Sequence, residues 1–204
     1  MPFRAAMGRV LQLALVGFAC SIAGSLLHPI AGAPIATVSF AILLPAYLWA
    51  VERQDSPLFL LSLGVTLFLT VPLTVIMWPT ITEAVDALLG PGLDDVTRSA
   101  VRASWAGGLA TMVVIATFVL FHPRRVPWIF MIAEVAGCTV VAGLLIAIGR
   151  NVGESLEAAA VLAASSWGGM RIAWLTGLGA MIGFLHLRRD RRDARAGEAI
   201  PIRL

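Results

Sequence analysis

Six long apolar segments limit the fold of this chain more than any other feature. They cover residues 10–27, 35–51, 57–78, 104–121, 128–148 and 168–187. A helix needs about 20 mostly apolar residues to cross a bilayer, and charged residues make up only 13% of the chain, about half their share in soluble domains. None of the segments alternates with the period of two that membrane barrel strands show. The sequence predicts an all-α, polytopic bundle of about six spans, forming a single integral membrane domain over residues 1–187.

The first segment must be distinguished from a cleavable signal peptide, because Arg4 and Arg9 precede the apolar run "VLQLALVGFACSIAGSLL". That run is about 18 residues long, whereas the apolar region of a signal peptide usually has about 7–15 residues. We therefore expect the segment to remain in the protein as its first span.

The distribution of arginine predicts the orientation, since the chain contains no lysine. With six spans, one side of the membrane would receive eleven arginines, and the other would receive Arg98, Arg102, Arg150 and Arg171. The eleven are Arg4, Arg9, Arg53, Arg124, Arg125, Arg188, Arg189, Arg191, Arg192, Arg195 and Arg203. Positive charge favours the cytoplasmic side. We expect a multi-pass protein of the cell inner membrane with both termini in the cytoplasm.

Residues 188–204 form a basic tail, "RRDRRDARAGEAIPIRL". Such a cluster beside a span serves as an orientation signal and binds anionic lipid heads. The tail lacks the aromatic residues that alternate with basic ones in single-strand binding segments. We therefore expect the lipid bilayer as its partner, and no nucleic acid.

Arg171 interrupts the last apolar stretch, which runs over residues 156–187 and is longer than one crossing requires. Arg171 and Arg188 are 17 residues apart, about 25 Å along a helix, so the two arginines bracket one span. Two readings remain open, a boundary arginine that snorkels to the outer interface and a contact for an anion. Residues 156–167 would then be interfacial, re-entrant or continuous with the last span, and Gly168-Gly169 is the natural joint.

Glu134 lies inside the fifth segment, nine residues from Arg125 and sixteen from Arg150. This spacing predicts a position near the middle of the membrane, where an acid costs about 2.5–3.5 kcal/mol to insert. Such an acid handles protons or substrate, or it is a neutral acid hydrogen-bonded to a neighbouring helix, for example to a threonine of the third span. Its expected cationic partner is Arg171.

Two further patterns concern packing. Thr66, Thr70 and Thr74 form a stripe along the third span, which packs helices together or lines a polar path. Gly179 and Gly183 form a GxxxG pair, which predicts close helix approach within the chain or in a homo-oligomer. Residues 79–103 read as a short amphipathic outer helix broken at "GPG".

Enzyme motifs are lacking from the sequence. There is no phosphate-binding glycine loop, no HExxH and no nucleophile elbow. His28 is expected at the opposite side from His122 and His186, so no three-ligand metal set forms on one face. Cys20 and Cys138 read as small apolar-span residues. We expect no catalytic residue, no metal and no cofactor.

Residues 9–125 carry a family resemblance. The run from "RVLQLALVGFACSIAG" to "LFLTVPLTVI", followed by "RSAVRASWAGGLATMVVIATFVLFHPRR", resembles the later helices of the membrane half of fusaric-acid-resistance and aromatic-acid exporter proteins. The matching positions are Arg98 or Arg102, Gly107, Gly108, Phe121, Pro123, Arg124 and Arg125. The resemblance implies export of small organic anions and identifies no binding residue.

Two functions therefore remain. The chain is a small transporter or exporter component for small organic solutes, anions among them, with Glu134, Arg171 and the threonines 66, 70 and 74 along its substrate or proton path. Alternatively, it is a non-transporting accessory or assembly subunit that binds a partner membrane protein. Transport predicts that Glu134, Thr70 and Arg171 meet at one cavity, and the accessory function predicts a solid bundle.

Overall fold

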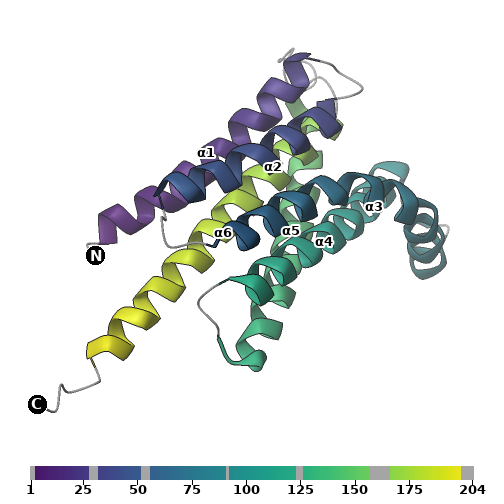
Figure 1. Cartoon of the computed structure of the whole chain (residues 1–204). Helices are drawn as coiled ribbons and strands as arrows, with labels where there is room; N and C mark the ends of the chain where they lie inside the picture. Colours follow the sequence, from purple (N-terminus) through teal and green to yellow (C-terminus); the bar gives the residue numbers. More distant parts are fainter. Residues whose placement is uncertain are drawn as a thin grey trace, which may run out of the picture.

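The computed structural model describes residues 3–27, 32–51, 56–90, 92–122, 126–156 and 166–198. Over these ranges the chain forms six helices and no strand (Figure 1). They are α1 (Phe3–Leu27), α2 (Gly32–Val51), α3 (Pro57–Leu89), α4 (Asp95–Phe121), α5 (Trp128–Leu156) and α6 (Ser166–Glu198). All six are long and apolar enough to cross a membrane. The predicted helical, multi-pass class is confirmed, with one helix for each expected segment.

The six helices form a closed ring. Each packs against its neighbours in sequence, and α6 closes the ring by packing against α1 along an extensive contact. The start of α1 and the end of α6 lie on the same side, at the lower left of Figure 1. We call this side, where α2, α4 and α6 end, the terminal side, and the opposite side the far side.

Glycines allow α1 and α6 to approach each other closely. A Cβ at Gly179 would collide with the carbonyl oxygen of Leu13, and a Cβ at Gly17 would collide with that of Leu175. At Gly183 the nearest atom would be the Cα of Val10, at 3.0 Å. The GxxxG pair of α6 therefore serves contact within the chain, which is one of the two roles that its spacing predicted.

The far ends of α3 and α4 differ from the predicted short amphipathic helix. The break at "GPG" is present, because α3 ends at Gly90, whose φ is 65°, a conformation that favours glycine. Both sides of the break, however, are continuous with the spanning helices. Asp86 near the end of α3 pairs with Arg98 and Arg102 of α4, at 3.4 and 2.5 Å, so these ion pairs join the two helix ends into one hairpin.

The last helix extends further than the apolar pattern indicated, on both sides. Gly168 and Gly169 lie inside the first turns of α6 and do not form a joint. At its other end α6 continues to Glu198, through the first residues of the segment that the sequence assigned to a basic tail. Of the expected separate element over 156–167, residues 157–165 lie outside the described ranges.

Candidate functional site

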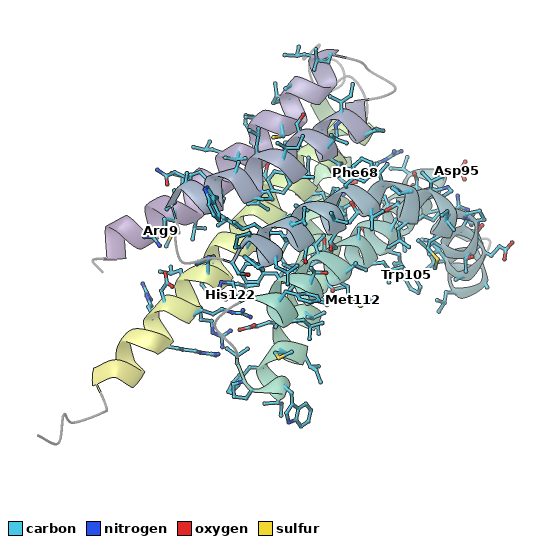
Figure 2. The ribbon with its side chains drawn as sticks, in the orientation of Figure 1. Arg9, Phe68, Asp95, Trp105, Met112 and His122 are labelled. Carbon is cyan, nitrogen blue, oxygen red and sulfur yellow. The ribbon has the colours of Figure 1, made fainter. Side chains whose placement is uncertain are left out.

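A cluster of buried polar side chains lies at the terminal side, where α4, α5 and α6 meet. Its members are His122, Glu134, His186 and Arg189, whose exposed fractions are 2%, 6%, 4% and 1%. His122 follows the last residue of α4, Glu134 lies in the second turn of α5, and the other two belong to α6. We call these four residues the terminal-side cluster, and Figure 2 labels His122 within it.

Local sequence explains the position of His122. Its backbone is extended, with φ −61° and ψ 134°, and the next residue is Pro123, which disfavours a helical conformation at the residue before it. The helix therefore stops here, and the amide of His122 still donates to the carbonyl of Phe118. This capping turn holds the imidazole against α6.

Two arginines from α6 contact the carboxylate of Glu134. The Nη2 of Arg189 lies 3.3 Å from Oε2, and the Nη1 of Arg188 lies 3.7 Å from Oε1. Arginine–carboxylate hydrogen bonds of full strength measure about 2.7–2.9 Å, so both contacts are long. Oε1 is buried and accepts no hydrogen bond from the residues that the structure describes. The glutamate is thus paired, but one of its oxygens lacks the hydrogen bond that a buried carboxylate normally forms.

Aromatic rings surround the charged groups. The guanidinium of Arg189 lies over the ring of Phe118, 5.0 Å from its centroid. The rings of His122 and His186 meet edge to face, with centroids 4.8 Å apart, and His122 also contacts Phe59 at 5.2 Å. A cation over an aromatic face is stabilised most when water is excluded. These rings border the buried ion pair of Glu134 and Arg189.

Other polar contacts surround the cluster at the same side. Arg9 of α1 pairs with Asp190 of α6 at 3.4 Å, and the hydroxyl of Tyr47 on α2 donates to Gln12 on α1. Arg192 lies over the ring of Phe130, 4.9 Å from its centroid. Arg9 is also labelled in Figure 2, on the side where α6 leaves the bundle. Contacts of α6 with α1 and α5 therefore continue past the apolar part of the helix.

The predicted pairing of Glu134 with Arg171 is wrong. Glu134 contacts Arg189 and Arg188, which follow the predicted end of the last span, and so it lies toward the terminal side of the bundle. Trp128 begins α5, and Glu134 follows it by six residues, about 9 Å along the axis. The prediction treated the arginines next to each apolar segment as the boundaries of the spans. Arg188 and Arg189 are instead packed within the helical bundle, beside Glu134.

Arg171 belongs to the opposite part of α6. Its backbone carbonyl accepts a hydrogen bond from the hydroxyl of Ser21 on α1, at 3.3 Å. Trp174, three residues further along α6, donates its indole N–H to the hydroxyl of Thr111 on α4, at 2.9 Å. The side chain of Trp174 therefore faces the bundle.

The threonine stripe forms no path with Glu134. Thr70 donates to the carbonyl of Leu67, and Thr74 donates to that of Thr70, so both hydroxyls bond within their own helix. Thr66 reaches Thr117 of α4 at 3.3 Å, which fits the packing role. Within the described ranges α3 makes no helix contact with α5. The threonine of the third span is therefore not the partner of Glu134.

The expected meeting of Glu134, Thr70 and Arg171 does not occur, because Glu134 lies beside Arg188 and Arg189 whereas Arg171 lies beside Ser21 at the opposite part of α6. An open, apolar groove of about 640 Å³ lies between α2 and α3 and is lined by residues such as Pro45, Trp49, Gly64 and Phe68. Neither Glu134 nor Thr70 nor Arg171 lines it. No group of three or more metal-binding side chains occurs in the described part of the chain. Cys20 is buried, and Cys138 is partly buried.

Sequence reasoning missed three of the four cluster residues. It placed His122 and His186 on the same side, and the structure brings their rings together, but it treated them only as unsuitable for metal. Arg189 was counted as an orientation signal. One feature of the sequence could have indicated the cluster. The two histidines and the first arginines of the tail fall at span ends on the same side, and the span that carries Glu134 begins on that side.

Comparisons with protein-family models, curated proteins and solved structures find no match to this chain.

Proposed function

We propose that the chain is a small proton-linked transporter, or the membrane component of an exporter, for small organic solutes that include anions. The terminal-side cluster is the observation that carries the proposal. Ionisable side chains within membrane helices are rare, costly and usually functional. Four of them, from three helices, here lie together in a buried site.

The chemistry of the cluster suits proton coupling. Imidazole changes charge near neutral pH, and a buried carboxylate with one unbonded oxygen offers a place for a proton. Protonation of Glu134 would weaken its attraction to Arg189 and Arg188, which join α5 to α6. A proton would in this way loosen the contact that closes the terminal side.

Access to a substrate path requires helix movement under this proposal. The described bundle is closed at the cluster, and a transporter that alternates its access must pass through such a state. The long contacts of Glu134, at 3.3 and 3.7 Å, support a closure that can open. The resemblance of residues 9–125 to aromatic-acid exporters points to the same class of solute.

Proteoliposomes test this function directly. The purified chain is reconstituted with a trapped pH dye, and p-toluenesulfonate or 4-sulfobenzoate is added outside, since their sulfonates stay ionised and cross lipid poorly. We expect proton movement that depends on the protein and the solute and falls at least tenfold in Glu134→Gln. The matched control is Arg192→Gln on the terminal part of α6, which should keep the flux. Absence of flux with both solutes would reject the transport proposal.

An accessory or assembly subunit is the second candidate, and a specific observation favours it. The glycine-packed contact of α1 with α6 is tight, and Glu134 and Arg171 do not meet at one site. The apolar groove between α2 and α3 would then receive a helix of a partner membrane subunit. Co-purification from native membranes, compared between the wild type and Gly64→Phe in the groove, distinguishes this candidate.

Both functions share a proposed location in the inner membrane with cytoplasmic termini, and a contact between anionic lipid heads and the C-terminal arginines. Reporter fusions at residues 1 and 204 test the orientation. Binding of a peptide spanning 188–204 to liposomes with and without anionic lipid tests the contact with lipid heads. Equal binding to both kinds of liposome would contradict that contact.

A further inference from the structure

We propose that Arg189 and Arg188 form a binding site for an organic oxyanion, and that Glu134 occupies this site in the closed state as an internal substitute for the ligand. The ligand class is a small monovalent carboxylate or sulfonate. This inference rests on the proposed transport function and identifies the residues that would hold the anion.

The geometry around Arg189 supports an anion site. A guanidinium presents several N–H donors in a planar fork that matches an oxyanion. Arg189 is 1% exposed, and its guanidinium is held against Phe118, so its orientation is fixed before any ligand binds. The donor facing α5 meets Oε2 of Glu134 at 3.3 Å. A carboxylate from another helix thus already fills the position that a ligand oxygen would take.

The second arginine provides the entry side. The side chain of Arg188 is 41% exposed and lies 3.7 Å from Oε1 of Glu134. Within the described ranges Oε1 accepts no hydrogen bond, so a proton can add there without breaking one of those contacts. An anion approaching along Arg188 would meet Glu134 from the side of this oxygen.

Exchange of the two acids keeps the charge balanced. In the closed state one glutamate carboxylate faces the two arginines. A proton added to Oε1 makes Glu134 neutral. The N–H groups of Arg189 then donate their hydrogen bonds to the oxygens of the incoming anion instead of to Glu134. One proton and one anion enter together, so the net charge of the buried site does not change. Either step alone would change the net charge beside the buried Glu134 and Arg189, which is unfavourable.

The other titratable groups nearby are accounted for on each packed helix. On α4 the group is His122, and on α6 they are His186, Arg188, Arg189 and Arg192, whose guanidinium lies over Phe130 one turn before Glu134. On α5 itself Cys138 lies one turn beyond Glu134. Neutral histidines leave the exchange as described. A protonated histidine would add a positive charge that attracts the anion and opposes the protonation of Glu134.

Binding and proton uptake are measured together to test the site. The purified chain in nanodiscs of zwitterionic lipid is titrated with p-toluenesulfonate in weakly buffered solution between pH 5.5 and 7.5. We expect affinity to rise toward tenfold for each pH unit lowered, and about one proton to be taken up for each anion bound at pH 7.5, as linkage requires. Because a sulfonate stays ionised over this range, the proton must bind to the protein.

The variants separate the roles of the acid and the arginine. Glu134→Gln should bind the anion at least tenfold more tightly at pH 7.5, with no pH dependence and no proton uptake. Arg189→Gln should lose binding, Arg189→Lys should retain a weakened form of it, and Arg192→Gln should match the wild type. Proton uptake by the wild type remains decisive if Arg189→Gln fails to fold. Unchanged affinity in Glu134→Gln, or anion binding without proton uptake in the wild type, overturns the inference.

A lipid phosphate could supply the same chemistry, so the titration is repeated in nanodiscs containing phosphatidylglycerol. Competition that removes p-toluenesulfonate binding, together with tight retention of phosphatidylglycerol, would overturn the free-anion site in favour of a lipid site. Binding with proton uptake but no flux in proteoliposomes would refute transport and retain the site. Flux without this binding would refute the site and retain transport.

Discussion

Glu134 of α5 and Arg189 of α6 form an ion pair with both side chains almost fully buried, at 2% and 1% exposure, and with a separation of 3.3 Å. Removing two charges from water costs several kcal/mol for each ion, and their attraction compensates fully only when the geometry is close. This contact is longer than the best arginine–carboxylate pairs. The pair therefore fixes the position of α6 more than it adds to stability.

Removal of one partner should destabilise the protein strongly. Glu134→Leu leaves Arg189 buried opposite an apolar side chain, and we expect a loss of about 3–5 kcal/mol in the free energy of unfolding. The double variant with Glu134→Leu and Arg189→Leu should recover most of that loss, because it buries no unpaired charge. Unfolding in detergent mixtures of increasing SDS content measures both. Additive losses in the double variant would mean that the two residues do not act as a pair.

The close approach of α1 and α6 should not tolerate a methyl group. Gly179→Ala places a Cβ against the carbonyl of Leu13, and overpacking of this kind costs about 1–3 kcal/mol. Gly137→Ala is the matched control, since a Cβ there meets nothing within 4 Å. This control should be neutral or stabilising by up to about 1 kcal/mol, because alanine favours helices. Equal stability of the two variants would contradict the described packing.

The contact between Trp174 and Thr111 should contribute a modest part of the stability. Thr111→Val removes the acceptor of the indole N–H and keeps the side-chain shape. Hydrogen bonds between membrane helices average about 0.6 kcal/mol, with a maximum near 1.7, and we expect a loss in that range. A double-mutant cycle with Trp174→Phe isolates the interaction. A coupling energy of zero would show that the hydrogen bond contributes nothing.

The first turn of α4 should loosen in acid. Asp94 caps this helix, and its pKa lies below the ordinary value because Thr97 donates side-chain and backbone hydrogen bonds to its carboxylate. A lowered folded-state pKa gives stability that is present above the unfolded pKa of about 3.9 and is lost as pH falls through the folded value.

Hydrogen exchange over residues 95–100 measures this effect, as the ratio of the rates in the wild type and in Asp94→Asn at each pH. Asparagine also caps helices well but does not titrate. The ratio should rise as pH falls below about 4. A constant ratio down to pH 2 would show that the Asp94 carboxylate does not stabilise the turn.

The spans could be predicted from sequence because length and apolar content decide them, and charged residues mark most of their ends. Glu134 stood out for the same reason, as an acid within such a run. Its partner could not be predicted, since helices that are apolar on every side do not show which face meets which neighbour. The continuation of α6 past Arg188 could not be predicted, because an arginine after an apolar segment indicates the end of a span. The sequence does not show whether that arginine packs against another helix.

The threonine stripe shows a second limit. A spacing of four residues places Thr66, Thr70 and Thr74 on one side of α3, but two of the three hydroxyls bond to carbonyls of the same helix. Spacing alone does not distinguish this local bonding from a polar path. The GxxxG pair was more informative, because small residues act through the space they leave open, whatever the partner helix.

Because the ring closes between α1 and α6, the first helix to be synthesised lacks its main packing partner until the last one has been made. α1 has its most extensive contact with α6, which begins about 140 residues after α1 ends. At about 5–20 residues each second, the glycine face of α1 remains uncovered for about 7–28 s after the helix has emerged. During this interval that face contacts lipid or the insertion machinery, and the arrival of α6 both completes the ring and brings Arg189 to the buried Glu134.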